Sequence, residues 1–359
     1  MKITSRQLAP LAAAVTWLPL AALSVMHARA NGTTNSFWHD FAVHGRCLVS
    51  VPALILADRL CVPRLWWIVS HFTKAGLIGD LERFDAATRW ARRAFESRNA
   101  MIALAVAAWP AAVAITLSYP ANNLPAWYYA DSGSRTYSAA AWWQILVSLP
   151  IALLLAFVWL WRLSVWTRLL FRVARCRLQL VAAHPDRSGG LGFLGTSLSA
   201  FAPIAFAFST IAASREAAAI LGHRAILSEH LYINAGFAVF CMSLIVLPLC
   251  AFTRVLMEGS RRGSLAYSIL AHQMGQEFER RWLAEGTGKV NTQALHEMDF
   301  SATIDLYSIV AGARGLRLVP VSRHNLLGLA ATLALPFAPV ILLLVPLDVI
   351  LGELRGLLF

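Results

Sequence analysis

The sequence has little charge, and it lacks the motifs that identify common soluble enzymes. Charged residues make up 14% of its 359 residues, against about a quarter in soluble domains, and 58% of the residues are hydrophobic. This composition excludes an ordinary soluble globular domain. The patterns HExxH, GxSxG and GxxxxGKS/T are absent. The sequence therefore offers no motif for a zinc peptidase, a serine hydrolase or a P-loop nucleotide site.

Cysteine is also scarce, and its spacing shows no CxxC pair, zinc pattern or disulfide framework. The five cysteines are Cys47, Cys61, Cys176, Cys241 and Cys250. We predict that they are small core residues, and we predict no metal and no other cofactor.

What the sequence does contain is seven apolar runs. A bilayer core about 30 Å thick needs about 20 apolar residues per helix. The runs lie at about 8–26, 43–60, 101–119, 141–161, 198–213, 233–252 and 326–351. The second is the weakest, because Asp58 and Arg59 lie near its end. The sequence therefore predicts an all-α fold: one polytopic transmembrane helical bundle over residues 1–359, with six or seven spans and additional interfacial and cytoplasmic amphipathic helices.

Basic residues predict the orientation of this bundle. The net charge is +12, but the basic residues form short clusters at the ends of apolar runs, so we predict no nucleic-acid partner. Segments 61–100, 162–197 and 253–325 hold most of the 31 Lys and Arg residues. The positive-inside tendency places these segments in the cytoplasm of a bacterial inner membrane, with the N-terminus cytoplasmic and the C-terminus periplasmic. The phospholipid bilayer and its anionic headgroups are the predicted partners.

Both ends of the chain leave an alternative open. Lys2, Arg6 and the sequence Ala-Arg-Ala at 28–30 also fit a cleaved signal peptide, but the apolar stretch between them is long for one, so we favour a retained helix. Prolines interrupt the run at 326–351, which predicts a span that is bent or only partly crosses the membrane.

Aromatic residues flank the predicted outer loop between the third and fourth runs. Amphipathic rings favour the headgroup level, so we predict that these residues anchor the protein at the interface. They are Trp127, Tyr128, Tyr129, Trp142 and Trp143.

Two of the predicted cytoplasmic segments read as amphipathic helices. The stretch Arg64–Arg98 fits either a helix lying along the membrane or one packed on its neighbours. In the third segment, Ser264–Leu283 and Thr292–Ala313 have helical spacing. An acidic metal cluster there is the less favoured interpretation, because no ligand spacing is diagnostic. Its members would be His296, Glu297, Asp299 and Asp305.

The stretch His184-Pro185-Asp186-Arg187-Ser188-Gly189-Gly190-Leu191-Gly192 is the candidate functional site. Proline biases His184 away from helix, and the glycines permit backbone angles that side chains forbid. His184 and Asp186 could bind a cation, while Arg187 and the amides of Gly189, Gly190 and Gly192 could hold a phosphate or carboxylate. The same residues would also make a tight helix-to-helix connection, and we favour this structural interpretation.

Several sequence stretches resemble a family of uncharacterised proteobacterial multi-pass membrane proteins. They are AHPDRSGGLGFLG at 183–195, RRGSL at 261–265, FERRWL at 278–283, RGLRLVP at 314–320 and the proline-bent C-terminal run. The resemblance extends from about His44 to the end of the chain. It implies a membrane protein of one architecture, with no known activity and no catalytic residue to carry over.

Three classes of function fit a protein of this kind. A membrane scaffold or regulatory partner, docking another protein or forming a homo-oligomer, is slightly favoured because it needs no chemistry that the sequence lacks. A transporter or channel would need charged groups at mid-membrane depth, which the runs do not clearly contain. An enzyme acting on headgroups at the cytoplasmic surface would have to use the 184–192 turn.

Overall fold

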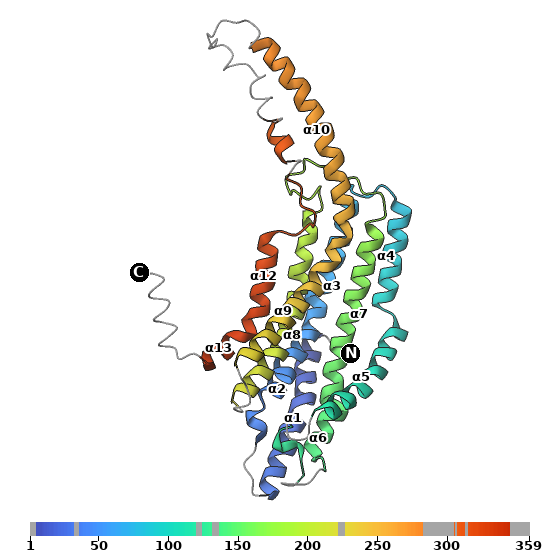
Figure 1. The fold of residues 1–359 in the computed structure, drawn as a ribbon. Coiled ribbons are helices and arrows are strands. Elements are labelled where there is room, and N and C mark those ends of the chain that lie inside the picture. The colour runs from blue at the N-terminus through green and yellow to red at the C-terminus, as the bar shows by residue number, and fades with distance from the viewer. Residues whose placement is uncertain are drawn as a thin grey trace, which may run out of the picture.

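The computed structural model describes residues 5–31, 36–119, 124–130, 136–221, 227–282, 305, 307–312 and 315–344. Within these ranges the regular structure is helical, apart from two isolated bridges between extended residues. Figure 1 shows an elongated bundle with one helix, α10, projecting far beyond it. The predicted all-α class is confirmed.

The helices of the first half are α1 (Ser5–Asn31), α2 (Phe41–His44), η2 (Gly45–Ser50), α3 (Val51–Lys74), α4 (Leu81–Phe95), α5 (Arg98–Ser118), η4 (Ala126–Tyr128), α6 (Ala139–Trp143), η5 (Gln144–Ser148) and α7 (Leu149–Val173). Those of the second half are η6 (Gly192–Gly195), α8 (Thr196–Leu221), α9 (Leu227–Val246), η7 (Leu247–Phe252), α10 (Thr253–Trp282), α12 (Arg323–Ala334), η9 (Leu335–Phe337) and α13 (Ala338–Leu344).

Six of the helical stretches are long and apolar enough to cross a membrane. They are Gln7–Asn31, Arg98–Ser118, Ala139–Val173, Gly192–Leu221, Tyr232–Glu277 and Arg323–Leu342. Each contains one of the predicted runs, or the described part of it, and the weak second run is not among the six. The chain is thus a multi-pass membrane protein by helix length and composition.

The second run nevertheless forms the centre of the bundle. Residues of α3 pack on α8 and α7, and Leu54, Ala57 and Cys61 are almost fully buried. The indole nitrogen of Trp159 on α7 donates to the Leu54 carbonyl at 2.8 Å, and the Ser50 hydroxyl donates to the Ala207 carbonyl at 2.9 Å. Such bonds between helices satisfy polar groups where water is absent.

The first helix is integrated into the bundle rather than detached from it. It packs on α3 and α6, with Leu20 and Ala9 buried and the Trp17 indole donating to His44 Nδ1 at 2.9 Å. This packing suits the retained helix that the sequence favours.

The predicted aromatic anchors divide into two groups. Trp142 is 51% exposed, as an interfacial anchor should be. Trp127 and Tyr128 are buried instead, against Phe37, Leu20 and other residues of a small second core. The Trp127 indole donates a hydrogen bond to Asp40 Oδ2 at 3.0 Å. This bond holds the loop around Trp127 against the residues that precede α2. The prediction that these two rings act as membrane anchors is therefore wrong.

The stretch Arg64–Arg98 is not one helix but parts of three. α3 ends at Lys74, and Gly76, whose φ is 65°, reverses the chain just after it. α4 then begins at Leu81, where the Asp80 side chain caps its first turn. Of the two alternatives for α4, the structure shows a helix packed on its neighbours. Phe84, Ala87, Ala91 and Phe95 form its buried face.

Aromatic and basic residues fix α4 against α3 and α7. The Arg172 guanidinium lies 3.8 Å from the centre of the Trp90 ring, and Arg92 lies 4.4 Å from that of Trp66. The Trp161 indole donates to the Ala94 carbonyl at 3.0 Å. α4 therefore stands beside the end of α7 and continues the line of α5 (Figure 1).

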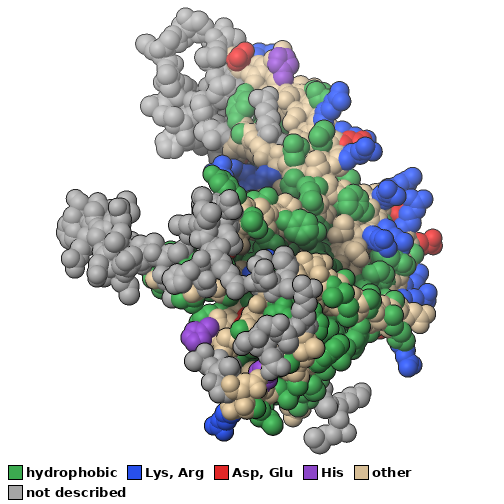
Figure 2. Space-filling model, turned by 60° about the horizontal axis from the view of Figure 1, so that its bottom comes forward, with side chains coloured by type: hydrophobic (Ala, Val, Ile, Leu, Met, Phe, Trp, Pro, Cys, Tyr) green, Lys and Arg blue, Asp and Glu red, His purple; other side chains and the backbone are tan. Residues whose placement is uncertain are grey.

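We call the end formed by α4, the C-terminal end of α7, residues 174–191 and α10 the basic end. Figure 2 shows Lys and Arg side chains gathered toward one side of the visible face and hydrophobic side chains over much of the rest. The predicted helix Ser264–Leu283 is the later part of α10, which begins at Thr253 and follows α9 and η7 with no break. Of the predicted helix Thr292–Ala313, only residues 305 and 307–312 are described. His296, Glu297 and Asp299 lie outside the described residues.

The last predicted run is bent, as its prolines indicate. α12 gives way at Leu335 to the short 3-10 helix η9, which contains Pro336, and α13 follows. The Ser209 hydroxyl of α8 donates to the Leu333 carbonyl just before this bend. The structure describes this run up to residue 344.

Candidate functional site

Residues 176–195 form a turn that joins α7 to α8 at the basic end. The turn pairs with the α3–α4 connection: the Gly79 amide donates to the Arg177 carbonyl and the Gln179 amide to the Leu77 carbonyl, both at 2.9 Å. Gly79 is required here, because a Cβ on it would lie 2.5 Å from the Arg177 carbonyl oxygen. Two connections far apart in the sequence are thereby fixed to each other.

Asp186 organises the tightest part of the turn. Its carboxylate accepts the amides of Ser188 at 2.8 Å, Gly190 at 3.2 Å and Gly192 at 2.7 Å. The backbone reaches this shape with φ values of 52°, 64° and 96° at Arg187, Gly189 and Gly190. The side chain of Asp186 thus takes the place that an external anion would occupy in a loop of this kind.

The protonation of Asp186 reflects these bonds. Partial burial opposes its ionisation, but the three amide donors and His184 outweigh burial and hold the pKa of Asp186 below its ordinary value. The carboxylate is therefore charged at neutral pH.

His184 is oriented by the same carboxylate. Its Nδ1 lies 2.8 Å from Asp186 Oδ1, and 44% of its side chain is exposed. The Asp186 amide also donates to Nδ1, at 3.3 Å, so both contacts with Asp186 use this ring nitrogen. Histidines that act as bases or as metal ligands are often held by a carboxylate in this way.

A cavity of about 500 Å³ opens beside His184. It is lined by His71, Ala75, Gly76, Leu77, Gln179, Leu180, Val181, His184, Asp186, Gly189, Gly190 and Phe193. His71, from the last turn of α3, packs against Phe193 with a ring separation of 4.4 Å. The volume suits a small molecule.

The structure brings together four of the six candidate residues. His184, Asp186, Gly189 and Gly190 line the cavity, whereas Arg187 and Gly192 are not among its lining residues. Arg187 is exposed. From the sequence, we predict that the amides of Gly190 and Gly192 could hold a phosphate. In the structure both amides donate to the Asp186 carboxylate.

Sequence reasoning missed eight of the twelve lining residues, and His71, Gln179 and Phe193 are the polar or aromatic ones among them. No local motif marks His71, because it reaches the cavity only through the pairing of the α3–α4 connection with the turn. Among the described residues, no group of three metal-ligating side chains was found. The cavity lining contains no serine, threonine, cysteine or lysine that could act as a nucleophile.

The turn is also where the base of α10 and the start of α12 are held. A Cβ on Gly263 would lie 2.2 Å from that of Ala182, and one on Gly259 would lie 3.7 Å from Leu180, so α10 crosses residues 180–182 at close range. The Arg317 amide donates to the Arg187 carbonyl at 2.7 Å. Helices α3, α4, α7, α8 and α10 and the segment that leads into α12 therefore meet at one connection, which supports an architectural role.

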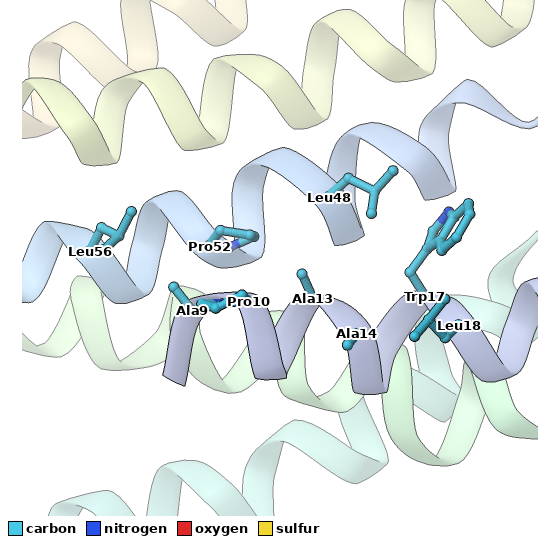
Figure 3. Close-up of a pocket in the computed structure, with 9 residues that line it drawn as sticks. All are labelled: Ala9, Pro10, Ala13, Ala14, Trp17, Leu18, Leu48, Pro52 and Leu56. Carbon is cyan, nitrogen blue, oxygen red and sulfur yellow. The ribbon is translucent and has the colours of Figure 1, made fainter. Parts of the chain in front are cut away.

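A second cavity lies between α1 and α3 and differs in chemistry. It has a volume of about 550 Å³, and its lining is apolar apart from the Trp17 indole nitrogen, which is bonded to His44 (Figure 3). The lining residues are Ala9, Pro10, Ala13, Ala14, Trp17, Leu18, Leu48, Pro52 and Leu56. A lining of this kind offers no group for catalysis or ion binding.

Comparison with known proteins adds no relative. No family model, curated protein or solved structure matches the chain.

Proposed function

We propose that this protein is a scaffold or regulatory partner in a bacterial inner membrane, and that α10 holds another protein on the cytoplasmic side. The observation that carries the proposal is the length and exposure of α10. The helical stretch Tyr232–Glu277 has 46 residues. At 1.5 Å per residue it is about 69 Å long, more than twice the bilayer core, so its polar half must lie outside the membrane.

The projecting half carries apolar side chains that the described residues do not cover. Leu265 is 62% exposed and Ile269 is 60% exposed, one turn apart on the same face. The other face, with Tyr267, Ala271 and Met274, packs against Val310. An apolar strip on a polar helix is the usual form of a helix-docking surface.

The base of α10 is held firmly, which a docking arm requires. Gly259 and Gly263 bring it against Leu180 and Ala182 of the turn. Pro248 in η7 is buried, as is Phe252, which stacks on Phe72 of α3 with ring centres 6.1 Å apart. A partner bound to α10 would therefore be held at a fixed place relative to the membrane.

Two further functions receive less support from the described residues. A carrier would use charged groups within the spans, but Asp58 is paired with Arg162, and Glu216 accepts from Asn234 at 2.9 Å. An enzyme would use the turn, where His184 has an orienting carboxylate but no nucleophile among the cavity residues.

The test is photocrosslinking in living cells. A photoreactive amino acid replaces Ile269 in one strain and Leu327 in a control strain. Leu327 is 69% exposed on the apolar helix α12, so it should contact lipid. We expect position 269 to capture a distinct protein band and position 327 to capture none. A third strain carries the photoreactive amino acid at Leu265. If neither position 269 nor position 265 captures a protein, the scaffold proposal fails.

A further inference from the structure

Five exposed arginines lie where α4 runs beside α7. Arg89 and Arg93 belong to α4 and are one turn apart. Arg168 and Arg172 are one turn apart on α7, and Arg175 lies just past its C-terminal end at Val173. We call this set the basic seam.

The packing of the two helices fixes how the basic seam is arranged. Arg172 stacks on Trp90, so it lies at the level of Arg89 and Arg93. The helices run in opposite directions, which places Arg168, one turn earlier on α7, about 6 Å closer to the spans and beside the last turn of α4. Phe171, next to Arg172 in the sequence, is 47% exposed. The basic seam is thus two columns of guanidinium groups with one apolar side chain beside them.

These guanidinium groups are not neutralised by ion pairs. Arg83 pairs with Asp80, and Arg162 pairs with Asp58. Within the described ranges, none of the five seam arginines forms an ion pair with a carboxylate, although Glu82, Asp85 and Glu96 lie on or next to α4. The stacking of Arg172 on Trp90 leaves its charge in place.

The height of the seam above the spans favours a protein over lipid headgroups. Arg98 begins the apolar helix α5, and Arg93 and Arg89 lie five and nine residues before it on the helix that continues its line. At 1.5 Å per residue these distances are about 7.5 and 13 Å. Arg175, just past the C-terminal end of α7, is thirteen residues beyond Arg162, or about 20 Å. The headgroup layer adds about 5–7 Å to each side of the core, and charges at physiological ionic strength are screened over about 8 Å. Arg93 and Arg168 therefore lie within reach of headgroups, whereas Arg172 and Arg175, about 15 and 20 Å beyond Arg162, lie at or beyond the limit of that attraction. The upper part of the seam is the part that favours a protein.

We propose that the basic seam binds an acidic segment of a partner protein, rich in Asp and Glu and with an apolar residue for the surface at Phe171. This inference rests on the proposed scaffold function and specifies the chemistry of the partner. A guanidinium group can form a bidentate pair of hydrogen bonds with a carboxylate. Such pairs would fix the register of the acidic segment along the seam.

The test uses the full chain in nanodiscs of zwitterionic lipid. A fluorescent peptide of alternating Glu and Leu is titrated by anisotropy. The double variant Arg89→Glu/Arg175→Glu reverses one charge on each side of the seam, away from the headgroups. Its control, Arg254→Glu/Arg261→Glu, reverses two exposed arginines of α10 and changes the net charge equally. We expect the seam variant to weaken binding by about tenfold, the equivalent of roughly 1.4 kcal/mol, and the control by less than about twofold.

Three results would overturn the inference. The peptide could fail to bind wild type, or both variants could weaken binding equally, which would indicate unspecific attraction to a basic protein. In nanodiscs with anionic lipid, displacement of the peptide together with seam-dependent lipid binding would assign the seam to headgroups. Capture at Ile269 reports the scaffold function separately: if capture persists while the peptide test fails, only the acidic-segment inference is lost.

Discussion

At the scale of single residues, Asp186 does most to shape the candidate site. Its carboxylate accepts hydrogen bonds from three backbone amides of the turn and contacts His184. One side chain therefore satisfies three backbone donors that point toward the inside of the turn. The sequence could indicate a defined turn at 184–192 from its proline and glycines. It could not show that the anion held by the glycine amides is Asp186 itself, because that depends on the full course of the backbone.

Removing the Asp186 carboxylate should destabilise the protein. Asp186→Ala leaves amides of the turn without an acceptor, which costs about 1–3 kcal/mol. We expect a lower melting temperature in detergent, with His184→Ala closer to wild type because it removes only one contact. An unchanged melting temperature for Asp186→Ala would contradict the architectural role.

The same carboxylate gives a pH dependence of known sign. Because the folded pKa of Asp186 is below its unfolded value, its charge stabilises the fold above about pH 4, and this contribution is lost as pH falls through the folded pKa. The difference in free energy of unfolding between wild type and Asp186→Asn should therefore be constant from pH 7 to about pH 5. Below about pH 4 this difference should become smaller. Melting curves across this range would show it. Asp85→Asn, on the exposed face of α4, is the matched substitution outside the turn.

Two glycines of the long α9–α10 helix should respond to alanine with opposite signs. Alanine at Gly236, where nothing lies within 4 Å, should add up to about 1 kcal/mol through helix propensity. At Gly263 the new Cβ would lie 2.2 Å from that of Ala182, and overpacking of about 1–3 kcal/mol should outweigh the same gain. Melting temperatures of the two variants measure the difference. Equal stabilisation by both would mean that α10 does not cross the turn closely.

At the scale of elements, long apolar periodicity predicted most helices, while their ends and partners depended on tertiary contacts. The run at 141–161 lies inside the α6–α7 helix, and the run at 101–119 matches α5, which ends one residue earlier at Ser118. The orientation of α4 could not be predicted, because its basic amphipathic pattern suits a lipid surface and a protein surface equally. Two tertiary contacts determine how α4 lies. Arg172 of α7 stacks on Trp90 of α4, and Arg92 of α4 stacks on Trp66 of α3.

The packing of α4 can be tested by depth-dependent quenching. A fluorophore at Arg89→Cys, in a background without the exposed Cys250, should be quenched by a water-soluble agent and little by quenchers on lipid chains. A fluorophore at Val106→Cys, 68% exposed on α5, should show the reverse. Strong lipid quenching at position 89 would restore the interfacial alternative.

At the scale of the whole molecule, several helices are longer than a membrane is thick. The α6–α7 helix has 35 residues, and the stretch Tyr232–Glu277 of the α9–α10 helix has 46. Their lengths of about 52 and 69 Å exceed the bilayer core by tens of ångströms. The excess lies at the basic end, where α4, the turn and α10 assemble around it (Figure 1). We therefore infer that α4, the turn and α10 form a packed layer outside the membrane at the basic end.

The orientation of that layer follows from charge and can be measured directly. Basic segments resist translocation, so the basic end should face the cytoplasm. Single cysteines are placed at His39, exposed at the opposite end, and at Glu82, exposed on α4, in a chain lacking Cys250. A membrane-impermeant maleimide should label position 39 in cells with a permeable outer membrane, and position 82 only after the inner membrane is opened. The reverse pattern would place α10 and the basic seam in the periplasm. Cytoplasmic partners would then be out of reach, so the scaffold proposal depends on this result.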